Sequence, residues 1–193
     1  LRIFRESSER FGTQDFLFVT FTPRGGLFSD ESLEAIAGLR DELSGLPRVD
    51  SVTSLVDVPL VEQAEGGLSE IASNYKTLSD PDIDRAAARR ELLDSPIYSD
   101  LIISDDARTT ALQVNLKTHP EFAEASKRRS ELLIERSEEG LTAGEAAELE
   151  RVEARYEALK DEVDAANHEN IARIREIMAA YEDYGTLHLG GLT

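Results

Sequence analysis

The run Phe16–Phe21, Phe-Leu-Phe-Val-Thr-Phe, starts the part of the chain that decides the fold, and it ends at a Pro-Arg-Gly-Gly loop. Its aromatic and β-branched residues predict a strand. Ser29 follows as a helix N-cap, and two acidic residues in the first turn oppose the positive end of the helix dipole. Apolar residues then recur at helical spacing up to Gly45, and residues 49–55 alternate as a second strand. The first 60 residues therefore predict a βαβ unit.

The clearest period-two pattern lies further along, at Thr109–Leu116 (Thr-Thr-Ala-Leu-Gln-Val-Asn-Leu), and it predicts a third strand. Residues 60–103, between the βαβ unit and this strand, are polar and predict a helical insertion. One short helix is expected at 68–78. A second is expected at 82–93, with Asp80 as its N-cap and a proline in the first helical position.

Two long helices of unequal length are predicted after Pro120, where the composition shifts to Glu, Ala, Arg and Leu. The first spans 121–139 and is closed by Gly140. The second, 142–181, starts with a Thr-Ala-Gly-Glu capping box. A heptad seam with one stutter runs along the second helix. Its members are Leu149, Val152, Tyr156, Leu159, Val163, Ala166, Asn170, Ile174, Ile177 and Tyr181.

The difference in length predicts how the two helices pair. If the chain folds back as an antiparallel hairpin over 120–160, residues 163–181 have no hairpin partner and must bury their apolar stripe on the sheet. The expected hairpin seam is Leu132, Leu133, Leu149, Val152, Tyr156 and Leu159. A last short strand, within 186–190, follows the second helix.

Without the insertion and the hairpin, the elements run in the order βαββαβ. This order predicts an α+β, ferredoxin-like fold, with two helices on one face of a four-stranded antiparallel sheet. We expect a single domain over 1–193, with its sheet core in 12–58, 104–118 and 163–191. The helical insert (60–103) and the helical hairpin (120–160) complete it.

Charge and composition limit the classes of function. The chain has 21 Lys and Arg against 39 Asp and Glu, a net charge of −18, which disfavours binding to nucleic acid. It has no cysteine, so disulfides and thiolate chemistry are excluded. Its apolar runs are far shorter than the roughly 20 residues of a membrane-spanning helix. The first and last residues are unlike natural ends, and we expect a piece of a longer protein.

Three histidines are the first candidates for chemistry: His119, His168 and His188. Asp164 and His168 are four residues apart and could share a helix face as two metal ligands. No third ligand is evident, and such pairs arise by chance on acidic helices. His119 is expected to end a strand and His188 to lie in a half-exposed one. We therefore predict no metal site.

The remaining polar clusters have structural explanations. Asp105-Asp106 and the Asp80–Asp82 segment resemble paired carboxylates, but a turn and a helix cap favour the same residues. The Gly-Gly pairs lack the spacing of phosphate-binding loops. The clusters at 127–129 and 89–90 are basic and are expected on solvated helix faces with i,i+4 partners. The sequence predicts no catalytic residue and no cofactor, and it leaves substrate-binding residues open.

Four stretches share their order and spacing with a known family. They are Phe11-Gly12; Leu27-Phe28-Ser29 through Leu46-Pro47, Val49, Val52 and Ser54-Leu55; Ser95-Pro96 through Leu101–Asp106 and Thr109–Ala111; and Ile171, Ile174, Ile177 and Tyr181 with Leu189-Gly190-Gly191. The second is similar to the family's L-F-S … L-P-x-V-x-x-V-x-S-L, and the third to its P-L … L-I-S-x-D-x-x-T-T-A. On these stretches the chain resembles the extracytoplasmic loop domain of RND-superfamily exporters of the MMPL, or hydrophobe-exporter, type.

The resemblance implies a porter-type periplasmic domain of a multi-pass cytoplasmic-membrane protein. That parent would export lipids or other hydrophobic molecules, driven by protons, and this domain would contribute to the substrate path. The proton-relay acids of the family lie in transmembrane helices, so none is assigned here. Implied partners are the parent's transmembrane helices, the hydrophobic substrate, and a second porter domain or partner protein at the hairpin. The alternative is a scaffold or adaptor that binds a protein partner through its hairpin and does not transport.

Overall fold

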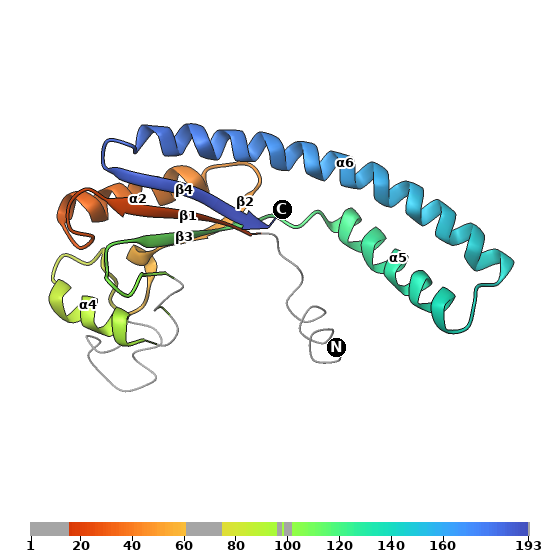
Figure 1. Ribbon diagram of the computed structural model, residues 1–193, viewed down its shortest axis with the longest axis horizontal. Helices are drawn as coiled ribbons and strands as arrows, with labels where there is room; N and C mark the ends of the chain where they lie inside the picture. The colour runs from red at the N-terminus through yellow and green to blue at the C-terminus, as the bar shows by residue number, and fades with distance from the viewer. Residues whose placement is uncertain (1–15, 61–74, 96–97, 99–101, 193) are drawn as a thin grey trace. The chain divides into compact units, whose positions relative to one another are not determined.

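The computed structural model describes residues 16–60, 75–95, 98 and 102–192 (Figure 1). These residues form two compact units. The first, here called the sheet unit, comprises the described residues up to Leu116 together with those from Ala172 onward. The second, the hairpin unit, is Lys117–Ile171.

The sheet unit contains a four-stranded antiparallel sheet with the strand order β2-β3-β1-β4. Its strands are β1 (Phe16–Pro23), β2 (Val49–Thr53), β3 (Thr110–Leu116) and β4 (Gly185–Leu192). All four predicted strands are present, and the predicted α+β class with an antiparallel sheet is confirmed. The first and last strands extend further than predicted because they pair with each other along eight residue positions.

Strand register places one row of side chains from each strand on a buried face. Val19 lies opposite Leu112 on one side and Leu189 on the other, and Leu17 lies opposite Val114. Burial alternates strictly along β1 and β3, as the period-two pattern predicts. The sheet therefore has one face that contributes to the core. The side chains of its other face are half-buried or exposed, and we call it the open face.

Helix α2 (Asp30–Ser44) begins and ends as the sequence predicts. The Ser29 hydroxyl accepts a hydrogen bond from the backbone N–H of Ser32 at 3.2 Å, and Gly45 is the C-cap. Its apolar stripe of Leu33, Ile36, Leu39 and Leu43 is buried, and the helix contacts β2 and β3. Burial of each of these side chains contributes about 1.5–3 kcal/mol.

The last turns of α6 (Ala143–Ala180) also belong to the sheet unit. Ile174 and Met178 are buried, and Ile177 is half-buried. Just beyond the helix, the Tyr181 hydroxyl donates a hydrogen bond to Glu42 on α2 at 2.8 Å. Burial, and then this hydrogen bond, raise the pKa of Tyr181 to about 12. Gly38 leaves room for the ring, because a Cβ atom there would lie 2.7 Å from the Tyr181 hydroxyl oxygen.

The insertion differs from the prediction at both of its expected helices. The second helix, α4, spans Arg85–Asp94 and is capped by Asp84, whose carboxylate accepts from the N–H groups of two following alanines. Asp80 cannot be that cap, because its carboxylate instead accepts from the backbone N–H of Thr77 at 2.6 Å.

The expected helix at 68–78 falls largely on residues 61–74, which lie outside the described residues. Its described end, 75–78, is not helical. Lys76 forms a bridge with Leu60 there, and the Leu60 N–H donates to its carbonyl at 2.8 Å. The second predicted strand also ends early. Residues 55–57 form a 3₁₀ turn, η1 (Leu55–Asp57), in which the Asp57 carboxylate accepts from the backbone N–H of Ser54.

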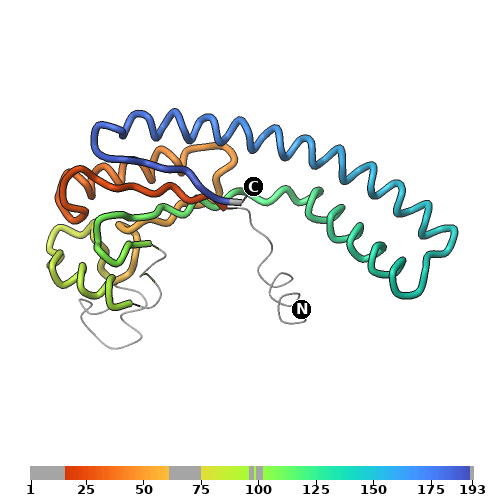
Figure 2. Tube along the Cα trace, viewed as in Figure 1, coloured from red at the N-terminus to blue at the C-terminus, as the bar shows by residue number. Residues whose placement is uncertain are grey.

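The hairpin unit consists of α5 (Pro120–Glu138) and the N-terminal part of α6, which run antiparallel in the trace (Figure 2). His119 caps α5 with its ring nitrogen Nδ1, and Gly140 ends it with a φ of +80°. The predicted capping box at Thr142 is confirmed, because Glu145 accepts from Thr142 and the Thr142 hydroxyl accepts from the Glu145 N–H.

Two glycines of β4 give a matched test of the sheet. A Cβ atom at Gly185 would overlap the carbonyl oxygen of Thr22 and lie 2.7 Å from Cα of Pro23. A Cβ atom at Gly190 would meet no described atom within 4 Å.

We expect Gly185→Ala to lower the free energy of unfolding by roughly 1–3 kcal/mol, since the backbone must move to admit the added methyl group. Gly190→Ala should leave it unchanged or raise it slightly. Urea unfolding of both variants checks this, and equal stabilities would contradict the β1–β4 register.

Candidate functional site

The seam of the hairpin unit holds its two helices together. Leu132, Leu149 and Leu159 are buried, as predicted. Leu133, Val152 and Tyr156, the other predicted seam residues, are half-buried. Ala125 and Val163 are also buried. The seam is therefore narrow, and the outer faces of both helices stay in solvent with their Glu and Arg side chains.

An aromatic contact lies across the hairpin near its base. The rings of Phe122 and Tyr156 are stacked, with centroids 5.2 Å apart and planes at 25°. The Arg129 guanidinium lies over the Tyr156 ring, 5.0 Å from its centroid. A cation and an offset ring each prefer the face of an aromatic ring, and together these contacts fix where α5 meets α6.

Ion pairs across the hairpin fix the same register. Arg128 binds Glu148 with two nitrogens, Nε at 2.7 Å and Nη2 at 3.0 Å, and Arg155 binds Glu121 at 3.1 Å. The sequence predicts i,i+4 partners for the basic cluster at 127–129. This is wrong for Arg128, whose strongest partner lies on the other helix, although it also contacts Glu131 at 3.3 Å. The bidentate geometry is more specific than an ordinary surface ion pair.

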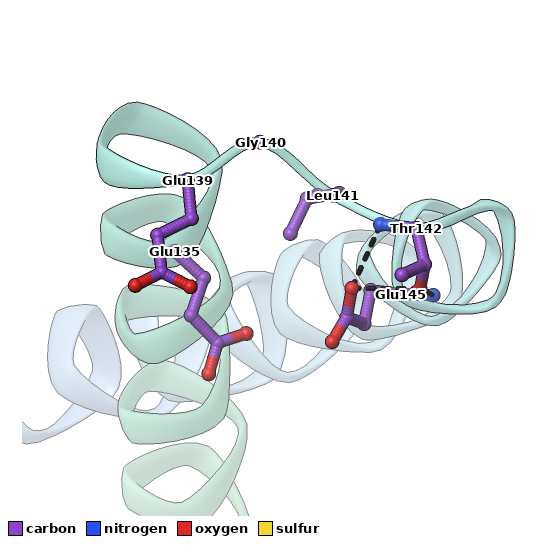
Figure 3. A pocket seen from close by; sticks show the side chains of 6 residues that line it. All are labelled: Glu135, Glu139, Gly140, Leu141, Thr142 and Glu145. Atoms are coloured by element: carbon purple, nitrogen blue, oxygen red, sulfur yellow. Dashed lines mark hydrogen bonds between the residues drawn. The ribbon is translucent and has the colours of Figure 1, made fainter.

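The tip of the hairpin encloses an open hollow of about 460 Å³ (Figure 3). It is lined by Glu135, Glu139, Gly140, Leu141, Thr142 and Glu145. The Glu145 carboxylate is already engaged, because it accepts from the backbone N–H of Thr142 at 2.8 Å and from its hydroxyl at 2.7 Å. These two hydrogen bonds lower the pKa of Glu145. The hollow is therefore the by-product of a helix cap and a tight turn.

The candidate metal pair does not come together as two ligands. Asp164 is ion-paired with Lys160 one turn earlier, and His168 is exposed. His119 caps a helix where the sequence predicted the end of a strand, and His188 is exposed on β4. In the described ranges, no group of three or more His, Asp or Glu side chains could hold a metal ion.

The acidic turn at 104–108 has a structural role. The carboxylate of Asp106 accepts from the Ser104 hydroxyl at 2.7 Å and from the Arg108 backbone N–H at 3.1 Å. Both bonds lower the pKa of Asp106. Ala107, between them, has a φ of +53°. The predicted turn is confirmed here.

The open face of the sheet is a surface that the analysis of single motifs missed. It carries Phe16, Phe18, Thr20 and Thr22 from β1, Ala111, Gln113 and Asn115 from β3, Ser51 and Thr53 from β2, and Thr186, His188 and Gly190 from β4. Its side chains interact: Asn115 donates to the Ser51 hydroxyl at 3.0 Å, and Gln113 donates to Asn115 at 2.8 Å. The alternation of residues 110–116 was the feature of the sequence that could have indicated this face. None of these twelve residues is Asp, Glu, Lys or Arg, although the chain carries a net charge of −18. The exposed Asp50 precedes Ser51 at the register shift of β2.

No protein-family model matches the chain, and no curated protein matches it significantly. Within the residues that the structure describes, no helix is both long and apolar enough to cross a membrane. The candidate functional surfaces are therefore defined by geometry alone: the open sheet face, and the hairpin with its cross-helix contacts.

The Arg128–Glu148 pair predicts that the stability of the chain depends on pH. The hydrogen bond from Arg128 lowers the pKa of Glu148 in the folded chain. A carboxyl whose pKa is lower folded than unfolded contributes stability above its unfolded pKa of about 4.3, and this is lost as the pH falls through the folded value. We expect Glu148→Gln to lower the thermal midpoint at about pH 7. Between about pH 7 and about pH 3, the thermal midpoint of this variant should fall less than that of the unchanged chain.

Thermal unfolding followed by circular dichroism measures this, with Glu150→Gln as the control. Glu150 is exposed on the same helix and the substitution removes the same charge. If Glu148→Gln and Glu150→Gln have the same pH dependence, the cross-helix pair does not stabilise the hairpin.

Proposed function

We propose that the chain is the periplasmic, porter-type domain of a proton-driven RND exporter of the MMPL type, which carries lipids or other hydrophobic molecules. Within this proposal the sheet unit is ferredoxin-like. The observation that carries it is the strand order β2-β3-β1-β4, with α2 after the first strand and α6 before the last. This is the arrangement expected of a split βαβ unit. The described residues of the four stretches that resemble the family belong to the sheet unit, apart from Ile171; Phe11-Gly12, 96–97 and 99–101 lie outside the described residues.

The open sheet face supports a role in the substrate path. Charged side chains are strongly hydrated. When a hydrophobic molecule displaces their water, their hydration free energy is lost, and this weakens binding. Desolvation of a surface made of Phe, Thr, Gln, Asn and Ser costs less free energy. Phe16 and Phe18 lie edge to face at 5.3 Å on this surface, and Phe16 is 38% exposed. Two adjacent, accessible rings give an apolar substrate a surface to contact. Proton coupling, in this proposal, belongs to the membrane part of the parent.

The alternative function is a scaffold or adaptor that binds a protein through the hairpin. The observation that favours it is that the hairpin unit is compact in its own right, with its register fixed by Arg128–Glu148 and Phe122–Tyr156. Ile134 is 38% exposed on α5, so an apolar side chain is available to a partner. An arm of this kind suits either function, and shortening it separates the two.

The periplasmic location can be tested with one introduced cysteine, because the chain has none of its own. Ser137 is exposed near the tip of the hairpin. In the full-length parent, with any cysteine outside this chain replaced, Ser137→Cys should react with a membrane-impermeant maleimide in intact cells. Leu132→Cys is the control: Leu132 is fully buried and should react only after denaturation. Reaction of Ser137→Cys only after the inner membrane is broken would contradict the proposal.

A shortened hairpin separates the exporter from the scaffold. Replacing residues 126–151 by a short Gly-containing turn removes the tip but retains the Phe122–Tyr156 and Glu121–Arg155 contacts. Since closing a shorter loop changes the entropy little, the sheet unit should still unfold cooperatively. In the parent, we expect efflux of a hydrophobic dye such as Nile Red to fall severalfold. Unchanged efflux, together with loss of a protein that co-purifies with the intact chain, would favour the scaffold.

A further inference from the structure

The two edges of the sheet differ in how they are protected. β2, at one edge, has five residues, carries Asp50, and has a register shift between Val49 and Ser51. Short length, a charge and a bulge are the usual protections of an edge strand against pairing with other chains. β4, at the other edge, has eight residues, Gly-Thr-Leu-His-Leu-Gly-Gly-Leu, without a charged residue or a proline. It has none of these protections.

The outer side of β4 is available for pairing. In the part of the chain that the structure describes, β4 pairs with β1 only. Its outward N–H and C=O groups are therefore a template for another strand. Leu187 and Leu189 lie opposite Phe21 and Val19, on the core side of the sheet. They are only half-buried, whereas Val19 and Phe21 are buried. An added strand would cover the exposed parts of both leucines.

Two pairs of identical residues in β4 are arranged symmetrically about His188, although Thr186 and Gly190 differ. Leucines stand one position away on each side, and glycines stand three positions away at Gly185 and Gly191. If two such strands pair antiparallel with His188 on the two-fold axis, Leu187 of one copy lies opposite Leu189 of the other. No position then places one charged side chain against another. An interface between identical copies must be complementary to itself, and this strand meets that requirement.

We propose that β4 pairs with β4 of a second copy of this chain, in antiparallel register centred on His188, and that the two sheets become one continuous sheet of eight strands. The net charge of −18 makes two copies repel over most of their surfaces. The uncharged edge is where they approach with the least repulsion, so added salt should strengthen the dimer. This inference does not depend on the transport proposal, because it rests on the edge strand alone.

Sedimentation equilibrium of the full 193-residue chain tests the dimer. The variant His188→Asp places two like charges opposite each other on the two-fold axis, which is destabilising. The control, Thr53→Asp, adds the same charge at an exposed residue of the other edge strand. We expect a monomer–dimer equilibrium that salt strengthens. The dissociation constant should rise about tenfold or more in His188→Asp and stay within about twofold in Thr53→Asp. A monomer at every concentration, or equal effects of the two variants, would overturn the proposal.

Cysteine cross-linking tests the register. Side chains directly opposite in an antiparallel pair have Cβ atoms about 4.5–5.5 Å apart, close to the separation that a disulfide needs. Since the chain has no cysteine, His188→Cys should give a covalent dimer under mild oxidation, and Thr53→Cys should not. If His188→Cys cross-links no faster than Thr53→Cys, a dimer seen by sedimentation is held by another surface and the proposal is wrong. Circular dichroism of each variant verifies that it is folded.

Discussion

The sheet unit depends on β1 pairing on both of its sides. This strand lies between β3 and β4, and each of these comes from a distant part of the chain: Val19 lies opposite Leu112 on one side and Leu189 on the other. Because side chains alternate between faces, a shift of one residue in either pairing would expose the buried row of β1. The buried face therefore fixes both registers at once. The apolar stripe of α2 packs against the sheet, in contact with β2 and β3.

Two close approaches hold the end of the chain against this sheet. Gly185 permits the backbone of β4 to start beside Thr22 and Pro23, where a side chain would meet main-chain atoms. Gly38 leaves space on α2 for the ring of Tyr181, whose hydroxyl binds Glu42. Residues 181–185 thus contact both β1 and α2. Both contacts require a residue without a side chain, at Gly38 and at Gly185.

The distribution of charge gives the open face and edge of the sheet their significance. Acidic residues exceed basic residues by 18, and a solvated helix face tolerates such an excess easily. The hairpin unit uses some of these charges in Arg128–Glu148 and Arg155–Glu121, where they fix the register of two helices. The open face of the sheet and β4 carry none. Both proposals about function follow from this contrast: an uncharged face suits a hydrophobic substrate, and an uncharged edge suits another strand.

The sequence alone determined most of the elements, because their signals are local. The Ser29 cap, the capping box at Thr142, the alternation of residues 110–116 and the turn at Asp106 each depend on residues within a few positions of one another. Where two local signals competed, the prediction failed: Asp80 and Asp84 are both suitable caps, and the hydrogen bond from Thr77 to Asp80 decided between them. His119 was likewise assigned to a strand end, and it caps a helix.

Only the tertiary structure decided which distant groups meet. Arg128 binds Glu148, twenty residues away, instead of an i,i+4 partner, because the hairpin register brings the two carboxylate oxygens within reach of its guanidinium. The sequence placed Asn170 in an otherwise apolar seam, and the structure shows it 3% exposed. The open face of the sheet is assembled from four strands that lie between Phe16 and Leu192. Periodicity shows which face of its own strand a residue occupies, but it does not show which strand lies beside it. Strand pairing is set by the register that buries the core.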